Sequence, residues 1–149
     1  MLGATAMPTS FKDIQEAFDF AETRGDFGEN RAFLCRRTGK VYLHSEFSDF
    51  DGLFDELPAD IEDEEKYLAI PDKRELGLGK PLVLDFAREY LPDDFDEVRY
   101  IFDKRGAYRK FRALVTRRNV LELWYAFEAK ATERALRDWC ELNSIIVTD

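Results

Sequence analysis

The chain has 149 residues, of which 45% are hydrophobic, and this suits one domain with its own core. Its formal net charge of −9 opposes a general attraction to nucleic acid or anionic lipid, although a total does not exclude a local basic patch. No apolar run approaches the roughly 18 residues of a membrane-spanning helix, and residues 1–10 lack the features of a signal peptide, so we expect a cytoplasmic protein with no membrane partner.

The first predicted element is a helix over residues 11–24, where apolar residues recur at helical spacing. Residues 32–36 and 40–44 are predicted to form the two strands of a hairpin. Gly39 is expected to supply the positive φ that the turn of this hairpin needs. The N-terminal part of the chain therefore predicts one helix followed by an antiparallel pair of strands.

The segment 46–65 carries ten acids and no base, but apolar residues interleave with the acids. It is therefore not compositionally disordered, and we expect it to lie on the core. The spacing of its carboxylates does not fit the twelve-residue calcium loop. A solvated acidic face is the favoured interpretation, and an adventitious divalent ion and a structural metal stay open. Residues 66–70 then predict a third short strand.

Four helices are predicted in the C-terminal half of the chain. Pro81 suits the first turn of one helix, and Pro92 both ends it and opens the next, which stops near Gly106. The last two helices are predicted over residues 107–118 and 120–143. The predicted fold class is α+β: an N-terminal helix, a small antiparallel sheet of about three strands with a hairpin, then about four packed helices.

The predicted domain organisation is simple. Residues 1–9 are expected to form a flexible N-terminus, and residues 10–149 a single α+β domain. No linker rich in glycine, serine or proline divides the chain, and no segment repeats at a fixed period.

An apolar stripe runs along the last predicted helix and favours a core-facing side. Both tryptophans belong to it, so both are predicted to be core residues. The stripe consists of Val120, Trp124, Phe127, Ala131, Ala135, Trp139 and Leu142.

Four stretches of the sequence form a set with fairly specific spacing: residues 38–42 (TGKVY), 105–111 (RGAYRKF), 124–127 (WYAF) and 137–143 (RDWCELN). The set resembles a bacterial uncharacterised protein family of about this length. Its members carry a Gly-Ala-aromatic-basic-basic-Phe stretch, a Trp-Tyr-x-Phe stretch and a Glu-x-Asn ending. The resemblance covers most of the chain and implies one compact domain, but the family has no assigned activity.

Two residues depart from that family pattern. Asn119, which is predicted to cap the helix over residues 107–118, stands where glycine is expected, and Glu128 stands where a base is commoner. Glu128 also lies near the apolar stripe. Because a carboxylate there is costly without a partner, an arginine partner is expected, and Arg118 is a candidate because it too falls on the apolar side of its helix.

Few residues of the chain suit catalysis or metal binding. The single histidine, His44, offers little for a catalytic triad or a metal site, and it is predicted to be a polar residue on an edge strand. Cys35 and Cys140 are predicted to be buried or half-buried free thiols. Residues 77–80 lack the GxxxxGK[ST] pattern of a phosphate loop and predict a plain turn. No cofactor or metal is expected, and a catalytic pair of carboxylates stays open.

The best-formed feature is a line of basic residues on the helix predicted over residues 107–118. The segment 99–118 carries eight bases and one acid. At about 100° per residue, its basic side chains mostly lie opposite the apolar side of the helix. We call the following set the basic ridge: Arg105, Arg109, Lys110, Arg112 and Arg117.

Three interpretations of the basic ridge stay open. In the first, the ridge is a solvated face or is neutralised by the chain's own acidic segment. In the second, it is a surface for an acidic protein partner. In the third, it is a nucleic-acid site in which Tyr100 or Tyr108 stacks on a base. The leading function hypothesis is a non-enzymatic protein-interaction or regulatory module. The alternative is an RNA- or DNA-binding protein, and an enzyme that uses carboxylates alone is the third hypothesis.

Overall fold

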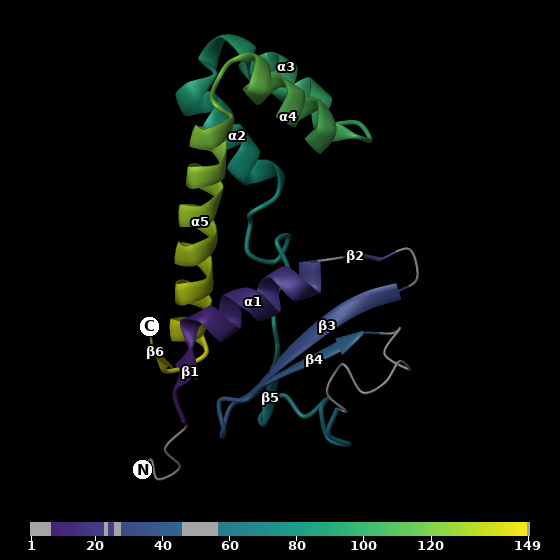
Figure 1. The fold of residues 1–149 in the computed structure, drawn as a ribbon, viewed down its shortest axis with the longest axis vertical. Coiled ribbons are helices and arrows are strands. Elements are labelled where there is room, and N and C mark those ends of the chain that lie inside the picture. Colours follow the sequence, from purple (N-terminus) through teal and green to yellow (C-terminus); the bar gives the residue numbers. More distant parts are fainter. Residues whose placement is uncertain (1–6, 23, 26–27, 46–56, 149) are drawn as a thin grey trace. The chain divides into compact units, whose positions relative to one another are not determined.

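The computed structural model describes residues 7–22, 24–25, 28–45 and 57–148. The fold class is α+β, as predicted (Figure 1). The elements are β1 Thr9–Ser10, α1 Phe11–Glu22, β2 Arg24–Gly25, β3 Gly28–Cys35, β4 Val41–Ser45, β5 Tyr67–Ala69, α2 Lys80–Tyr90, the 3₁₀ helix η1 Pro92–Asp94, α3 Phe95–Ile101, α4 Ala107–Arg117, α5 Leu121–Leu142 and β6 Val147–Thr148.

The chain forms two compact units. Met1–Asp72 and Leu136–Asp149 together make one, which we call the sheet unit, and Lys73–Ala135 makes the other, which we call the helical unit. Helix α5 contributes residues to both units. One domain over residues 10–149 stays a prediction.

The central strand of the sheet unit is β3. It pairs antiparallel with β2, β4 and β5, so that Phe33 lies opposite Tyr42 of β4 and opposite Ala69 of β5. Residues 32–35 are all buried, and a strand with four consecutive buried residues is covered on both faces. The predicted hairpin and third strand are confirmed. His44 is half-buried on β4, opposite Arg31.

Helix α1 covers the sheet. Its buried residues Phe11, Ile14 and Phe18 recur at spacings of three and four, which places them on one side of the helix. Figure 1 shows α1 running alongside β3. The Arg137 guanidinium, near the end of α5, stacks 4.0 Å from the centroid of the Phe11 ring. This cation–π contact joins the C-terminal part of α5 to the start of α1.

The hairpin turn requires glycine at position 39. Cys35 closes the turn, since its N–H donates to the Lys40 carbonyl at 2.8 Å and its carbonyl accepts from the Gly39 N–H at 2.9 Å. Gly39 has a φ of +75°, as predicted. A Cβ at Gly39 would lie 2.8 Å from the Pro8 carbonyl oxygen, which is too close for any other residue.

The N-terminal segment holds the turn in place. Thr9 is buried and lies opposite Val147 in the parallel pair of β1 and β6. Its hydroxyl donates to the Gly39 carbonyl at 3.3 Å, and the Met7 N–H donates to the Arg37 carbonyl at 3.0 Å. Residues 7–9 of the stretch predicted to be flexible therefore contact the hairpin.

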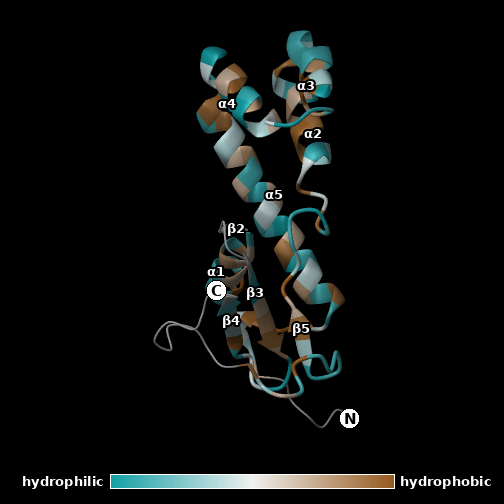
Figure 2. Cartoon of the chain, turned by 90° about the vertical axis from the view of Figure 1, so that its right-hand side faces the viewer, coloured by the Kyte–Doolittle hydropathy of each residue, from teal (hydrophilic) through white to brown (hydrophobic). Residues whose placement is uncertain are grey.

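Three aromatic rings form the centre of the helical unit. The Phe86 ring of α2 lies 6.3 Å from that of Phe111 on α4 and 5.2 Å from that of Trp124 on α5, and the last two are 5.0 Å apart. All three side chains are buried, which confirms Trp124 as a core residue. Figure 2 shows hydrophobic and hydrophilic residues interleaved along each helix, as in amphipathic helices. The four predicted C-terminal helices are confirmed, and Asn119 takes the left-handed conformation of a cap residue, with a φ of +65°.

The prediction of one continuous apolar stripe on α5 is wrong at its C-terminal end. Trp139 is only half-buried, and Leu142 is 84% exposed. The buried residues there are Leu136 and Cys140, which lie about 120° and 160° around the helix axis from Trp124. A single stripe fails because the two halves of α5 bury different sides.

The predicted pair of Glu128 and Arg118 is also wrong. The Glu128 carboxylate lies 3.6 Å from the Lys73 ammonium. Arg118 instead donates two hydrogen bonds to Asp94, at 3.0 and 2.9 Å, because it ends α4 with its side chain directed toward η1. It is half-exposed, so its place on the apolar side of the helix is not confirmed.

The ion pair of Arg118 with Asp94 gives the first testable prediction. The two hydrogen bonds from Arg118 lower the pKa of Asp94 from its ordinary value of 3.8. Its contribution to stability is therefore complete above pH 3.8 and is lost as the pH falls through the lower value of the folded state. We expect Asp94→Asn to lower the Tm at neutral pH and to flatten the acid limb of the Tm profile, measured by circular dichroism. Asp93→Asn is the control, and equal effects of the two variants would contradict the assignment.

Candidate functional site

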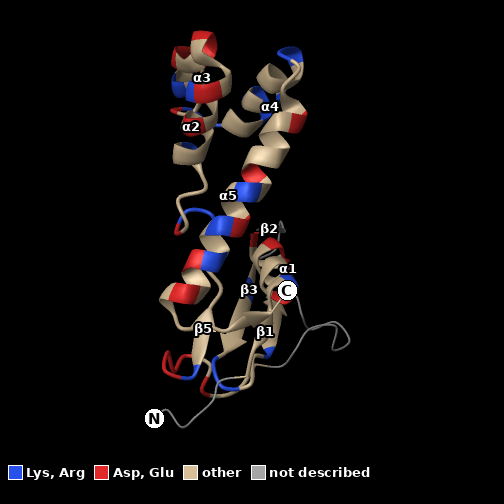
Figure 3. Ribbon diagram, turned by 90° about the vertical axis from the view of Figure 1, so that its left-hand side faces the viewer, with Lys and Arg blue, Asp and Glu red and all other residues tan. Residues whose placement is uncertain are grey.

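The first candidate site is the basic ridge on α4. The helix buries Phe111, Leu114 and Val115, while the opposite side faces solvent. Arg105 precedes the helix, and the other members of the ridge lie on it. All five are exposed, as predicted, and Figure 3 shows basic residues along α4.

Within the part of the chain that the structure describes, most charges of the basic ridge lack an opposite charge nearby. The Arg117 guanidinium lies 3.9 Å from the Glu97 carboxylate. Among the described residues, no carboxylate comes within 4.0 Å of the other four members, Arg105, Arg109, Lys110 and Arg112. The predicted acidic partner segment falls largely outside the described residues, which omit 46–56. Asp60, a described acid of that segment, pairs with Lys66 at 2.9 Å.

The nucleic-acid hypothesis names two tyrosines, Tyr100 and Tyr108, and both are exposed. Tyr100 is 62% exposed, but the Lys104 ammonium lies 4.6 Å from its ring centroid. The Tyr108 ring is perpendicular to that of Phe102, with centroids 5.0 Å apart. Both tyrosines therefore have an intramolecular ring contact that a stacked base would have to share or replace.

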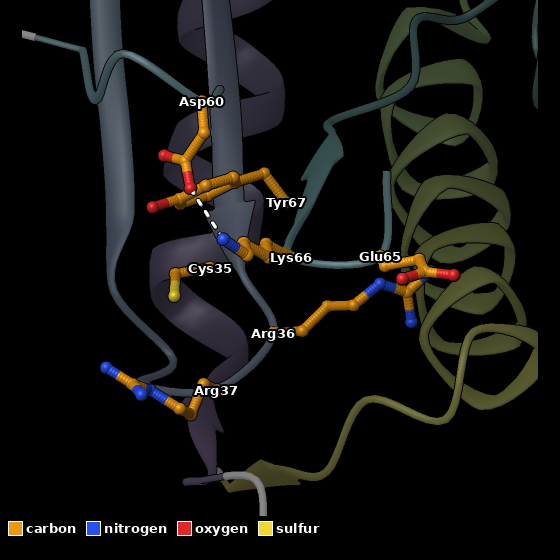
Figure 4. A pocket seen from close by; sticks show the side chains of 7 residues that line it. All are labelled: Cys35, Arg36, Arg37, Asp60, Glu65, Lys66 and Tyr67. Carbon is orange, nitrogen blue, oxygen red and sulfur yellow. Dashed lines mark hydrogen bonds and ion pairs between the residues drawn. The ribbon is translucent and has the colours of Figure 1, made fainter. Parts of the chain in front are cut away.

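The second candidate site is a pocket of about 450 Å³ at the hairpin of the sheet unit. We call it the hairpin pocket (Figure 4). Sequence reasoning missed it, because the strand end at Cys35 and the acidic stretch around Asp60 are separate in the chain. A cysteine followed by threonine and glycine within a hairpin turn was the available signal. The lining residues are Cys35, Arg36, Arg37, Asp60, Glu65, Lys66 and Tyr67.

The turn supplies hydrogen-bond donors to the Cys35 sulfur. The backbone N–H groups of Arg37 and Thr38 and the Thr38 hydroxyl all interact with Sγ. The Thr38 oxygen already accepts from the Lys40 N–H at 3.2 Å, which leaves its O–H proton for the sulfur. Burial raises the pKa of Cys35, but these hydrogen bonds and the Arg37 charge outweigh burial and lower the pKa below its ordinary 9.0.

The pKa of the other cysteine is shifted in the opposite direction. Cys140 is buried in α5, and burial raises its pKa to about 11, against a smaller effect of Arg137. Both cysteines are free and buried, as predicted. The chain thus has one thiol whose surroundings favour the thiolate and one whose surroundings oppose it.

A charged pair closes one side of the hairpin pocket. The Lys66 ammonium donates to the Asp60 carboxylate at 2.9 Å, and this hydrogen bond lowers the pKa of Asp60 and raises that of Lys66. Burial raises the pKa of Tyr67. In the view of Figure 4, Cys35 lies between this pair and the Arg37 side chain.

Other features of the described chain add no site. No group of three or more His, Cys, Asp or Glu residues among the described ones could hold a metal ion. Residues 77–80 begin with a turn in which Gly77 has a φ of +69°. No helix in the described residues is long and apolar enough to cross a membrane. The family resemblance stays a prediction, because no protein-family model matches the chain and neither curated proteins nor solved structures show a match to it.

Proposed function

We propose that the protein is a non-enzymatic interaction module whose basic ridge binds an acidic segment of a protein partner. The observation that carries this proposal is the uncompensated charge of the ridge. Four exposed bases, Arg105, Arg109, Lys110 and Arg112, have no carboxylate within 4.0 Å among the residues that the structure describes. Guanidinium groups suit such a role, since they bind carboxylates through two parallel hydrogen bonds.

The buried side of α4 supports this role. Phe111, Leu114 and Val115 are almost wholly inaccessible, so the helix is held rigidly against the helical unit. A rigid helix keeps the spacing of its exposed bases fixed, and this lowers the entropy cost of binding. The ridge is therefore a preformed surface.

The distribution of charge favours an acidic peptide over a nucleic acid. The helical unit has 14 basic and 11 acidic residues, whereas the sheet unit has 8 basic and 20 acidic residues. The attraction is thus local, within the roughly 10 Å over which charges act at 0.1 M salt. A long polyanion is also repelled by the net charge of −9 of the whole chain, whereas a short acidic segment that contacts only the ridge is repelled much less.

Nucleic-acid binding is the second candidate function. It is favoured by the exposure of two tyrosines that are close to the basic ridge in the sequence, Tyr100 and Tyr108, which are 62% and 48% exposed. Aromatic rings next to basic groups are typical of surfaces that bind single strands. The ring contacts of both tyrosines within the chain make this the weaker proposal.

The test is a double charge reversal, Arg109→Glu with Arg112→Glu. We expect binding of a labelled glutamate-rich peptide, measured by fluorescence anisotropy, to weaken at least about tenfold, because two attractive charges become repulsive. The unfolding free energy should change by less than about 0.5 kcal/mol, since both side chains are exposed and unpaired among described residues.

The matched control reverses two exposed bases elsewhere in the helical unit, Lys130→Glu with Arg134→Glu. It makes the same change in net charge and should leave peptide binding nearly unaltered. A single-stranded RNA of equal charge is titrated in parallel. Tighter binding of the RNA that depends on Arg109 and Arg112 would favour the second candidate, and failure of both probes to bind would reject the ridge as an interaction surface.

A further inference from the structure

The hairpin pocket lies in the sheet unit and is independent of the basic ridge. Among the described residues, some of the charged side chains that line it are paired with an opposite charge and others are not. The Asp60 and Lys66 side chains neutralise each other. Among the described residues, the Arg36 guanidinium donates to neutral groups, the carbonyls of Glu64 at 3.1 Å and Asn143 at 3.2 Å, and its positive charge is not balanced by a carboxylate within 4.0 Å.

Arg37 is an exposed cation of the pocket and, unlike Lys66, forms no ion pair with a described residue. No carboxylate of a described residue lies within 4.0 Å of its guanidinium. The nearby turn is fixed, because the Arg37 carbonyl accepts from the Met7 N–H and Gly39 is locked against Pro8. Arg37 therefore projects from a rigid backbone, and no described side chain engages its hydrogen-bonding fork, which could bind a ligand.

A second pocket, in the helical unit, contains an arginine whose guanidinium is already paired with a carboxylate. It has a volume of about 330 Å³ and is lined by Asp93, Asp94 and Arg118 among others. There the guanidinium already forms two hydrogen bonds with Asp94. The hairpin pocket differs because, among the described residues, neither lining carboxylate, Asp60 or Glu65, lies within 4.0 Å of the Arg37 guanidinium.

The pocket also has an apolar wall and a suitable size. The Tyr67 ring lines it and is held edge-on against the Tyr42 ring, with centroids 6.2 Å apart. A volume of about 450 Å³ lies within the range of small-molecule sites. An apolar wall beside an available guanidinium suits a ligand with an apolar body and one anionic group.

We propose that the hairpin pocket binds a small organic anion, a carboxylate or a phosphate monoester, with its oxyanion on Arg37 and its apolar body against Tyr67. Both anions match the planar fork of a guanidinium. The surroundings of Cys35 agree with this, since burial there opposes ionisation and the turn donors and Arg37 still favour a negative charge.

Cys35 at the pocket wall serves as the reporter for binding. A ligand beside Sγ blocks access to the sulfur, and its negative charge also disfavours the thiolate. Both effects slow alkylation by iodoacetamide. The probes are benzoate, phenyl phosphate and inorganic phosphate, with benzyl alcohol as the neutral analogue. The rate at each cysteine is read by mass spectrometry of peptides.

We expect benzoate or phenyl phosphate to slow the alkylation of Cys35 saturably, by about tenfold at nine-tenths occupancy. The slower reaction of Cys140 should not change. Arg37→Gln should abolish the protection, whereas Lys12→Gln, which removes an exposed charge on α1, should retain it. Protection by benzoate alone identifies a carboxylate ligand, and protection by the phosphate probes alone identifies a phosphate ligand.

Direct titration of the Cys35→Ser variant by calorimetry separates binding from thiol chemistry, and circular dichroism checks that each variant is folded. The proposal is overturned if none of the anions slows the alkylation of Cys35 and none binds the Cys35→Ser variant. It also fails if benzyl alcohol protects as well as benzoate, or if protection survives in Arg37→Gln.

Discussion

Replacing Trp124 with alanine should destabilise the protein by about 3–5 kcal/mol, the usual cost of removing a large buried aromatic side chain. Trp124 is 6% exposed, and its ring lies 5.2 Å from that of Phe86 and 5.0 Å from that of Phe111. No neighbouring side chain can fill the volume left, because the interior is close-packed. The measurement is chemical denaturation monitored by far-ultraviolet circular dichroism.

Two other residues of the predicted stripe, Trp139 and Leu142, are the controls. Trp139→Ala should cost less than Trp124→Ala, because Trp139 is half-buried. Leu142→Ala should change the unfolding free energy by less than about 0.5 kcal/mol, since this side chain is 84% exposed. A loss at Leu142 as large as that at Trp124 would mean that the stripe is buried along its whole length.

The order of elements could be predicted because local signals fix it. Pro81 and Pro92 mark helix starts through their fixed φ and missing N–H, and Gly39 marks the hairpin turn. Each signal acts within a few residues, so it does not depend on the rest of the fold. Helix α2, the 3₁₀ helix η1 and the turn between β3 and β4 follow these signals closely.

Tertiary pairing could not be predicted in the same way. Glu128 was predicted to pair with Arg118, whereas it pairs with Lys73, which is 55 positions earlier in the chain. Helical periodicity shows which side of a helix a residue occupies, but not which distant side chain reaches it. The apolar stripe failed at Leu142 for a related reason, because periodicity assumes one buried side along the whole of α5.

The two candidate sites also differ in how far the sequence could predict them. Four of the five residues of the basic ridge lie on one helix, so their spacing in the sequence fixes their spacing in space. The hairpin pocket joins the end of β3 to Asp60 and to β5, and only the pairing of β3 with β5 brings Cys35 opposite Tyr67. Such a site has no continuous sequence pattern.

The two free cysteines are expected to differ strongly in reactivity, with Cys35 alkylated at least about tenfold faster than Cys140 at pH 7. A thiol with a pKa of about 11 is roughly one part in 10⁴ thiolate at this pH, and one below 9.0 exceeds roughly one part in 10². The weaker nucleophilicity of the more acidic thiolate offsets about tenfold of that ratio. The burial of Cys140, which is 1% exposed, widens the difference further.

The source of the difference is tested with Thr38→Val, which keeps the shape of the side chain and removes the hydroxyl that donates to Sγ. Because that hydrogen bond favours the thiolate, its loss should raise the pKa of Cys35 and move the pH profile of alkylation to higher pH. Thr132→Val is the matched control, since the Thr132 hydroxyl donates to the Glu128 carbonyl at 2.8 Å within α5, in the other unit. It should leave the profile of Cys35 unchanged. Equal rates at the two cysteines, or a profile of Cys35 that Thr38→Val does not move, would show that the turn does not activate this thiol.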